Sequence, residues 1–233
     1  QMQKLLRNRK LVISIFVVLI LIATLVALGP LFYSIYMGRG VETKPVDAAH
    51  TKPASTELDG NWHVIAGTPH NFTSVGFSID EILPAEKTRT SGSTKEVEGQ
   101  AVIKDQKVEE GTIVVDMTNL TTDKKVRDQN MKDKLFITRE YPEASFKLTE
   151  PADLSNVPED GSVAKVTLTG ELTIKDKTKK VSEDFDVVRD DKTIVLGGSI
   201  PVNRLDYGIE TPELIAAKIA EEGEVNIRVT LEK

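Results

Sequence analysis

The chain contains no cysteine, and this absence removes several classes of site at once. Without a thiol there is no disulfide, no thiolate metal site, no cysteine nucleophile and no lipid-modified cysteine. Histidine is scarce as well, and His50, His63 and His70 lack the spacing of a metal-binding motif. We therefore expect a domain that is stabilised by its own core and that holds no metal.

Common catalytic motifs are also missing. The sequence contains no GxSxG, HExxH, Walker or GxGxxG pattern. Asp123, Asp128 and Asp133 recur five residues apart, which spreads them around a helix, whereas a calcium loop needs glycine and a bidentate glutamate at fixed places. We expect a protein that is not an enzyme. An enzyme acting on a lipid is the weakest alternative, because no carboxylate or histidine stands out as a catalytic group.

Acidic side chains are missing from the first forty residues, which carry five basic ones. The whole chain has 30 basic and 36 acidic side chains, so the rest has 25 and 36, a net charge of −11. So acidic a domain lacks the basic face that a nucleic-acid binder needs. It is also unsuited to broad adhesion on anionic lipid headgroups. The composition therefore excludes nucleic acid as a partner.

One uninterrupted hydrophobic run, Leu11 to Leu28, has no charged residue over eighteen positions. As a helix it is about 27 Å long, close to the roughly 30 Å hydrocarbon thickness of a bilayer. Basic residues precede the run and aromatic residues follow it, which the positive-inside rule associates with a cytoplasmic N-terminus. We predict a cytoplasmic basic tail over residues 1–10 and a transmembrane anchor over residues 11–36. The flanking residues are Lys4, Arg7, Arg9 and Lys10 before the run, and Phe32, Tyr33 and Tyr36 after it.

A cleaved signal peptide is the alternative interpretation of this run. Signal peptides have an apolar core of about 7–15 residues and a small-x-small cleavage site. The run is longer, and the small pair Ala27 and Gly29 is followed by Pro30. These features favour a retained single-pass anchor in the plasma membrane, with the remaining chain outside the cytoplasm.

The rest of the chain divides into a linker and one domain. Residues 37–59 are rich in proline, alanine, threonine and lysine and lack hydrophobic periodicity, so we expect an extended, solvated linker. Residues 60–233 show short runs with alternating apolar side chains, separated by turn residues. Such runs predict an antiparallel sandwich or barrel, and nine or ten strands in one domain fit a closed barrel better than a single open sheet. We expect strands at 74–79, 97–103, 112–118, 145–149, 164–168, 171–174, 181–188, 193–196, 200–202 and 224–231.

Two segments favour helices instead. Residues 122–135 combine a polar face with a sparse apolar stripe of Val126, Met131 and Leu135. Residues 211–223 begin with a candidate N-cap, Thr211, followed by proline, and end at Gly223. Interior residues of a barrel of about eight strands either pack against each other or surround one small ligand. The sequence leaves both arrangements open.

Four ordered motifs over the chain from Trp62 onward resemble the YceI-like family of lipocalin-like exported proteins. Trp62 with Ser74-Val75-Gly76-Phe77 is similar to the family's opening strand. The other three motifs resemble its helix-to-strand stretch, its hairpin and its segment before the last strand. They are Arg127-Asp128-x-x-Met131 with Tyr141-Pro142 and Phe146; Gly170-Glu171-Leu172-Thr173-Ile174 with Thr178; and Asn203-Arg204-x-Asp206-Tyr207-Gly208. The anchored form looks like the membrane-tethered actinobacterial members.

The resemblance implies an all-β, lipocalin-like, extended antiparallel barrel with a capping helix, after one N-terminal transmembrane helix. It implies a tunnel for a polyprenyl lipid or a menaquinone-type quinone, with no covalent cofactor. We expect Arg127 and Asp128 to clasp the helix to the barrel by an ion pair or hydrogen bonds. The candidate lipid-binding residues are the inward-facing apolar side chains Phe77, Ile79, Val115, Met117, Phe146, Leu148, Leu172, Phe185, Val187, Leu196 and Ile200.

Two binding hypotheses follow. The first is a membrane-tethered, extracytoplasmic protein that binds a polyisoprenoid lipid or quinone beside the bilayer that stores it. The second is a non-catalytic accessory subunit of a larger membrane assembly, such as a respiratory complex, with the helix docking laterally and the acidic domain meeting a basic partner. The expected partners are the lipid bilayer, the polyisoprenoid and, under the second hypothesis, integral membrane subunits.

Overall fold

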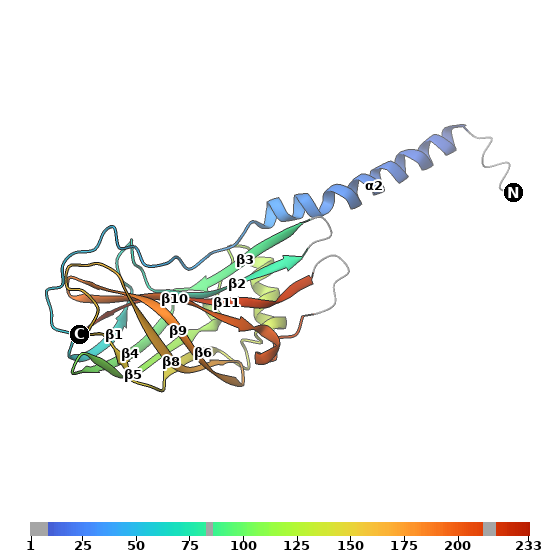
Figure 1. Cartoon of the computed structure of the whole chain (residues 1–233). Helices are drawn as coiled ribbons and strands as arrows, with labels where there is room; N and C mark the ends of the chain where they lie inside the picture. Colours follow the sequence, from blue (N-terminus) through green and yellow to red (C-terminus); the bar gives the residue numbers. More distant parts are fainter. Residues whose placement is uncertain (1–8, 83–85, 212–217) are drawn as a thin grey trace.

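The computed structural model describes residues 9–82, 86–211 and 218–233, which form a long N-terminal helix followed by a β-barrel (Figure 1). Helix α2, Arg9–Met37, projects from one end of the barrel. It is long and apolar enough to cross a membrane, and its most apolar window is not covered by the rest of the molecule. A signal sequence meets the same criteria, so the helix could serve as either.

The barrel is a closed ring of eight antiparallel strands, in the order β1-β4-β5-β6-β8-β9-β10-β11, with β11 pairing back to β1. The predicted all-β barrel is therefore confirmed. The strands are β1 Gly60–Ile65, β2 Ser74–Ile82, β3 Lys87–Thr94, β4 Val97–Lys104, β5 Lys107–Asp116, β6 Glu143–Leu148, β7 Ala152–Asp153, β8 Ala164–Ile174, β9 Lys177–Asp190, β10 Thr193–Asn203 and β11 Lys218–Glu232.

Strand β11 is long enough to take two partners on one side. Its last residues pair with β1, and its earlier residues pair with β2, which in turn pairs with β3. The β2–β3 pair therefore lengthens the barrel wall at the end near α2 (Figure 1). Along the described strands, β8 and β10 each merge two strands that the sequence suggested separately, namely 164–168 with 171–174 and 193–196 with 200–202.

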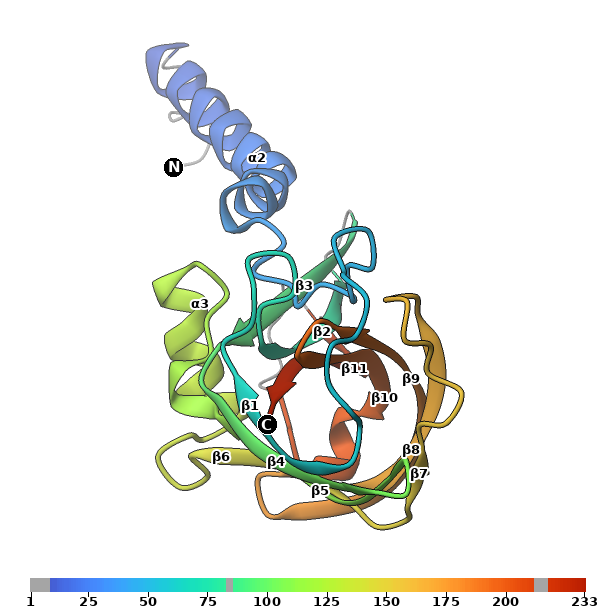
Figure 2. The same ribbon diagram turned by 90° about the vertical axis from the view of Figure 1, so that its left-hand side faces the viewer.

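A helical segment covers the barrel between β3 and β6 (Figure 2). Helix α3, Lys125–Asn130, continues into one π-helical turn, Met131–Leu135, as the sequence predicted for residues 122–135. The apolar stripe is only partly correct, because Met131 is buried whereas Val126 is 72% exposed. Pro142 precedes β6, and its carbonyl accepts a hydrogen bond from the Met117 amide, so the Tyr141-Pro142 pair does lead into a strand.

Asp128 fixes the start of this helix. Its carboxylate accepts hydrogen bonds from the Thr121 hydroxyl, at 2.7 Å, and from the Thr122 amide and hydroxyl, both at 2.6 Å. Burial alone would raise the pKa of the Asp128 carboxyl, but these hydrogen bonds outweigh it and lower the pKa below 3.8. Because the ionised form makes the bonds, the carboxylate stabilises the fold above the ordinary pKa of aspartate, and this contribution disappears as pH falls through the lowered pKa.

We expect Asp128→Asn to lower the free energy of unfolding by about 1–2 kcal/mol at pH 7, because the neutral amide replaces one carboxylate oxygen that accepts hydrogen bonds. The difference from the wild type should begin to shrink below pH ~4, where the carboxyl of the unfolded chain becomes protonated, and should disappear below the lowered pKa of the folded form. Urea unfolding followed by circular dichroism at pH 7 and pH 3.5 measures both effects. The exposed Asp123→Asn is the control and should change little. A pH-independent difference for Asp128→Asn would contradict this account.

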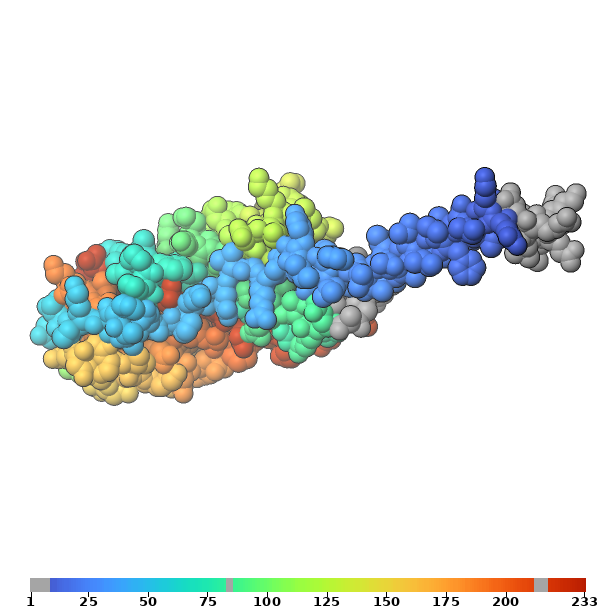
Figure 3. Space-filling view, turned by 90° about the horizontal axis from the view of Figure 1, so that it is seen from above, coloured from blue at the N-terminus to red at the C-terminus, as the bar shows by residue number. Residues whose placement is uncertain are grey.

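Residues 38–59 are extended and mostly exposed, as predicted, but they are not a free spacer, because they run along the barrel and bond to it. Figure 3 shows this segment in light blue along the outside of the barrel. Val41 and Arg39 exchange backbone hydrogen bonds with Ser91 of β3, at 3.0 and 2.8 Å. Farther along, Leu58 is only 6% exposed and packs in the core at the opposite end of the barrel. Composition alone suggested a spacer because proline, threonine and lysine supply few apolar contacts.

Strand β3 was not predicted, because its sequence, Lys87–Thr94, has no apolar alternation. Its small polar residues are nevertheless buried, since segment 38–59 covers them from outside. The Ser91 hydroxyl hydrogen-bonds to that of Ser78, at 2.7 Å, and Ser78 also accepts from the Asn226 amide. The helix expected over residues 211–223 is wrong for its described end, because Lys218–Gly223 belong to β11. Residues 212–217 of that prediction lie outside the described chain.

Candidate functional site

The barrel interior contains three apolar cavities that adjoin one another in a row. We name them the mouth cavity, the middle cavity and the end cavity, with volumes of about 300, 60 and 80 Å³. The mouth and middle cavities share Phe77, Phe136, Ile174 and Val225 in their walls. The middle and end cavities share Ile113 and Phe146, whereas the mouth and end cavities share no residue. The order along the barrel is therefore mouth, middle, end.

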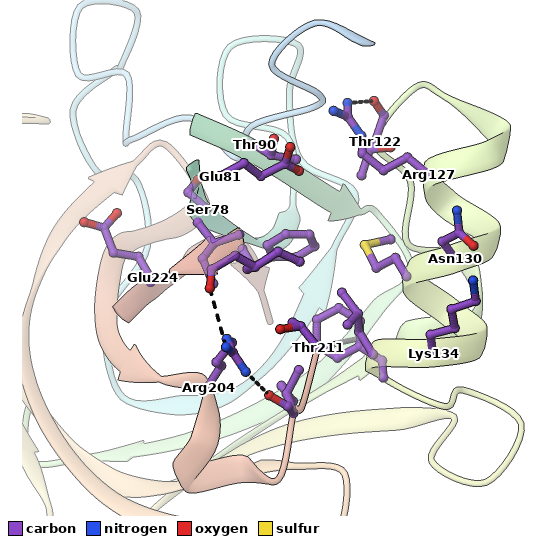
Figure 4. A pocket seen from close by; sticks show the side chains of 18 of the residues that line it. Ser78, Glu81, Thr90, Thr122, Arg127, Asn130, Lys134, Arg204, Thr211 and Glu224 are labelled. Atoms are coloured by element: carbon purple, nitrogen blue, oxygen red, sulfur yellow. Dashed lines mark hydrogen bonds between the residues drawn. The ribbon is translucent and has the colours of Figure 1, made fainter. Parts of the chain in front are cut away.

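The mouth cavity lies at the end of the barrel that faces α2. Strands β2, β3 and β11 form one side, α3 with its π-helical turn forms another, and the segment after β10 closes the third (Figure 4). Tyr33 and Met37, from the last turns of α2, also line it. The end of the apolar helix therefore lies at the rim of the largest of these three apolar cavities.

Aromatic side chains partition the row of cavities. The rings of Phe77 and Phe136 lie 5.6 Å apart at the boundary of the mouth and middle cavities. Phe146 stands between the middle and end cavities and lies over Gly170, where a Cβ would meet the ring at 2.6 Å. Trp62 lines the end cavity and is only 2% exposed. A chain-shaped ligand would extend through the row only if the phenylalanine rings turned aside.

Two arginines at the mouth hold backbone segments together. Arg127 donates to the carbonyl oxygens of Met37, Gly38 and Thr122, at 3.1–3.2 Å. Arg204 donates to those of Ile209, Ala220 and Ile219, at 2.7–3.4 Å. The clasp expected from Arg127 and Asp128 therefore consists of hydrogen bonds, and the two residues bond to different partners. Arg127 ties the end of α2 to α3, while Asp128 ties the first turn of α3 to Thr121 and Thr122 before it.

Two polar atoms in the wall of the mouth cavity are buried and have no hydrogen-bond partner among the described residues. They are the Thr90 hydroxyl and the Nε of Arg127 (Figure 4). A buried polar group without a partner costs about 1–3 kcal/mol. An acceptor on a bound molecule would remove this cost. The otherwise apolar mouth cavity is therefore suited to a ligand with one polar end.

The motifs singled out in the sequence converge on this cavity. Met131 of the helical motif, Ile174 of the hairpin, and Arg204 and Tyr207 of the segment after β10 all line it. The hairpin turn is joined to that segment, because the Lys175 ammonium donates to the Gly208 carbonyl at 2.9 Å. Burial, followed by the charge of Asp206, raises the pKa of the Tyr207 hydroxyl above 10.0, which keeps it neutral.

Nine of the eleven predicted lipid-binding residues line one of the cavities. The mouth cavity is lined by Phe77 and Ile79. The middle cavity is lined by Phe77 again and by Val115, Met117, Phe146 and Leu172. The end cavity is lined by Phe146 again and by Leu148, Val187 and Leu196. Phe185 and Ile200 are buried in the same apolar core but line none of the three. Phe185 instead packs over Gly198, where a Cβ would lie 2.6 Å from the ring.

Sequence reasoning missed much of the mouth cavity, namely Met131, Leu135, Phe136, Tyr207, Ile209, Ile219 and Val225. Most of these residues come from the α3 segment and from the irregular segment after β10, where no strand alternation marks the inward face. The motif residues Met131 and Tyr207 did offer a signal. Neither was among the candidate lipid-binding residues, although both are almost fully buried beside the cavity.

Comparison with known proteins identified one family. The model of the YceI-like domain matches residues 65–231, which is most of the chain and nearly all of the barrel. The comparison with curated protein sequences gave no match.

Solved structures support the same fold. A polyisoprenoid-binding domain from Saccharophagus degradans, implicated in plant cell wall breakdown, is 17% identical with a TM-score of 0.53. The aligned region covers 73% of this chain and 97% of the Saccharophagus chain. The BcnA protein of Burkholderia cenocepacia is 19% identical with a TM-score of 0.51, covering 66% of this chain and 95% of its own. At these identities the similarity establishes a shared barrel architecture.

Proposed function

Because the chain belongs to the YceI-like domain family, we propose that it is a membrane-tethered, extracytoplasmic binding protein for a polyisoprenoid lipid or an isoprenoid quinone. The row of three apolar cavities along the barrel axis carries this proposal. Small-molecule sites are usually apolar cavities of about 300–1,000 Å³ with a few polar groups. The mouth cavity alone is at the lower end of this range, and the similar domain from Saccharophagus degradans is a polyisoprenoid-binding domain.

The ligand's apolar chain would enter the mouth cavity and extend toward the end cavity. Each isoprene unit of five carbons contributes on the order of 2–4 kcal/mol when buried, at about 0.8 kcal/mol per CH₂ group. Passage from the mouth cavity into the middle cavity requires Phe77 and Phe136 to change rotamer. Passage from the middle cavity into the end cavity requires the same of Phe146. We propose that the ligand contacts the nine cavity-lining residues among the candidates: Phe77, Ile79, Val115, Met117, Phe146, Leu148, Leu172, Val187 and Leu196.

The polar end of the ligand would remain at the mouth. The Thr90 hydroxyl and the Nε of Arg127 are the donors without a partner among the described residues, and both lie in the cavity wall. A quinone carbonyl or a prenyl phosphate oxygen would accept a hydrogen bond from either. A single polar group bound there would lie next to the end of α2, at the level expected for a membrane surface.

The tether gives the binding site access to its ligand. Tyr33 and Met37 belong to α2 and also line the mouth cavity, so the anchor and the mouth form one structural unit. Arg127 strengthens this connection by bonding to the last carbonyls of the helix. With α2 in the bilayer, the mouth would lie at the interface where a prenyl chain leaves the membrane. A freely diffusing carrier would instead have to take its ligand from water.

Purification of the native full-length protein in mild detergent tests the proposal. Mass spectrometry of an organic extract should find about one prenyl lipid or quinone per chain, and the intact mass should include the residues of α2. Absence of any prenyl compound would contradict lipid binding. An intact mass lacking α2 would contradict only the tether, because the barrel would remain a binding domain.

The second function, an accessory subunit of a larger membrane assembly, predicts a different result from the same preparation. The apolar side chains of α2 are exposed along its described length, including Phe16 at 64% and Leu25 at 75%, so the helix has a free surface for other helices. The acidic domain would suit a basic partner. Stoichiometric recovery of respiratory or other membrane subunits with an empty barrel would favour this function over lipid carriage.

A further inference from the structure

Two histidines and an aspartate from separate segments meet on the outside of the barrel. Asp47 and His50 belong to segment 38–59, and His70 belongs to the connection between β1 and β2. The imidazole rings of the two histidines are stacked, with centroids 3.9 Å apart and planes inclined by 7°. The Nδ1 of His50 lies 2.8 Å from the Asp47 Oδ2, and the Nδ1 of His70 lies 3.7 Å from the same oxygen.

The three side chains bring together atoms that can bind a metal ion. Each residue offers one ligand atom, and the three atoms lie within 4.8 Å of one another. Tetrahedral zinc with bonds of about 2.0–2.1 Å separates its ligand atoms by about 3.3 Å. The separations of 2.8 and 3.7 Å lie on either side of this value. Because the stacked rings lie in nearly parallel planes, at least one imidazole would also have to rotate about its side-chain torsions so that both nitrogens face one ion.

Surrounding hydrogen bonds already orient the aspartate. The Asp47 amide donates to the Asn71 side-chain oxygen, and the Asn71 side-chain nitrogen donates to the Asp47 carbonyl, both at 2.8 Å. The Ala49 backbone amide donates a hydrogen bond to the other carboxylate oxygen, Oδ1, at 2.9 Å. Oδ2 is thereby directed to the histidines. Supporting contacts of this kind are typical of the residues around metal ligands.

A buried arginine connects the two segments that supply the ligands. Arg228 of β11 is 2% exposed, and its Nη1 donates to the carbonyls of Pro45 and His70, at 3.0 and 3.2 Å. It also donates to the Phe72 carbonyl and packs over the Phe72 ring. Because these contacts fix the backbone on both sides of the cluster, a bound ion would not have to order either segment.

We propose that Asp47, His50 and His70 bind one Zn²⁺ ion, with water in the fourth position. Two imidazoles and one carboxylate are ligands that suit zinc and its neighbours rather than calcium or magnesium. The bound ion fastens segment 38–59 to the β1–β2 connection, on the surface of the barrel and away from the lipid cavities. The site therefore does not depend on the proposed lipid function. The expectation from sequence that the chain holds no metal would then be wrong, because His50 and His70 are paired only by the fold.

Titration of the full-length protein in detergent micelles, without a polyhistidine tag and after treatment with a chelator, tests this proposal. Calorimetry with ZnCl₂ should give one site per chain. We expect His50→Ala and His70→Ala each to weaken zinc binding by at least about tenfold. His63→Ala is the matched control and should bind as the wild type does, since His63 is the exposed third histidine of the chain, on β1. Co²⁺ in place of zinc should give the visible absorption of a tetrahedral site, which both ligand variants lose.

Hydrogen exchange followed by mass spectrometry adds a structural readout. Zinc should slow amide exchange within residues 38–59 of the wild type and of His63→Ala, with no such effect in His50→Ala. Equal zinc binding by all three histidine variants, or no stoichiometric binding by the wild type, would overturn the proposal. Because the same samples can be assayed for extracted lipid, failure of the metal site is distinguishable from failure of lipid binding.

Discussion

Ile79→Trp is expected to remove most of the prenyl lipid that co-purifies with the protein. Ile79 lies on β2 and lines the mouth cavity, where the larger indole would occupy space that the ligand chain needs. Displacing one isoprene unit forfeits about 2–4 kcal/mol of burial, which corresponds to roughly a 30- to 700-fold loss of affinity at 1.4 kcal/mol per factor of ten. Quantitative mass spectrometry of lipid per mole of purified chain measures this loss.

An outward-facing tryptophan is the matched control. Thr167 lies on β8 with its side chain exposed, so Thr167→Trp adds the same bulk outside the barrel. It should retain the wild-type amount of lipid. Thermal unfolding should confirm that Ile79→Trp is folded, since the mouth cavity of about 300 Å³ has room for the added atoms. A folded Ile79→Trp that carries as much lipid as Thr167→Trp would refute the mouth cavity as the ligand site.

The barrel itself was predictable, because one side of each ring strand faces an apolar interior. Alternation such as Val166 and Leu168, or Ile113 and Val115, follows directly from the period of two in a strand. Nine cavity-lining residues were identified in this way. The same pattern cannot distinguish a cavity wall from packed core, so Phe185 and Ile200 were included although they line no cavity.

Other parts depended on contacts between distant segments, which local patterns do not encode. Strand β3 has small polar residues on both faces because segment 38–59 covers it, as the hydrogen bonds at Ser91 illustrate. His50 and His70 come together only because Arg228 and Asn71 connect the segments that carry them. The position of Tyr33 and Met37 at the mouth likewise depends on how α2 meets the barrel. Each of these was invisible to residue spacing.

Trp62→Ala should destabilise the barrel more than any other single change considered so far. The indole is 2% exposed and packs at the end of the barrel opposite the mouth, with Leu58, Ile103, Val187 and Ile194. Its Nε1 donates to the Leu58 carbonyl at 2.8 Å, which ties segment 38–59 to the first strand. Truncation of a buried tryptophan to alanine costs about 3–5 kcal/mol through lost burial and the cavity left behind. For a domain of this size the melting temperature should fall by roughly 10 °C.

Two further variants separate the contributions of the ring and the hydrogen bond. Trp62→Phe keeps an aromatic ring but leaves the Leu58 carbonyl without its donor, so it should lose less, about 1–2 kcal/mol. Leu205→Ala removes a large side chain that is 46% exposed and should have little effect. Because Trp62 is the one tryptophan of the chain, unfolding must be followed by circular dichroism instead of intrinsic fluorescence. If Trp62→Ala melted within a degree or two of Leu205→Ala, segment 38–59 and the core around Trp62 would contribute far less to stability than their packing indicates.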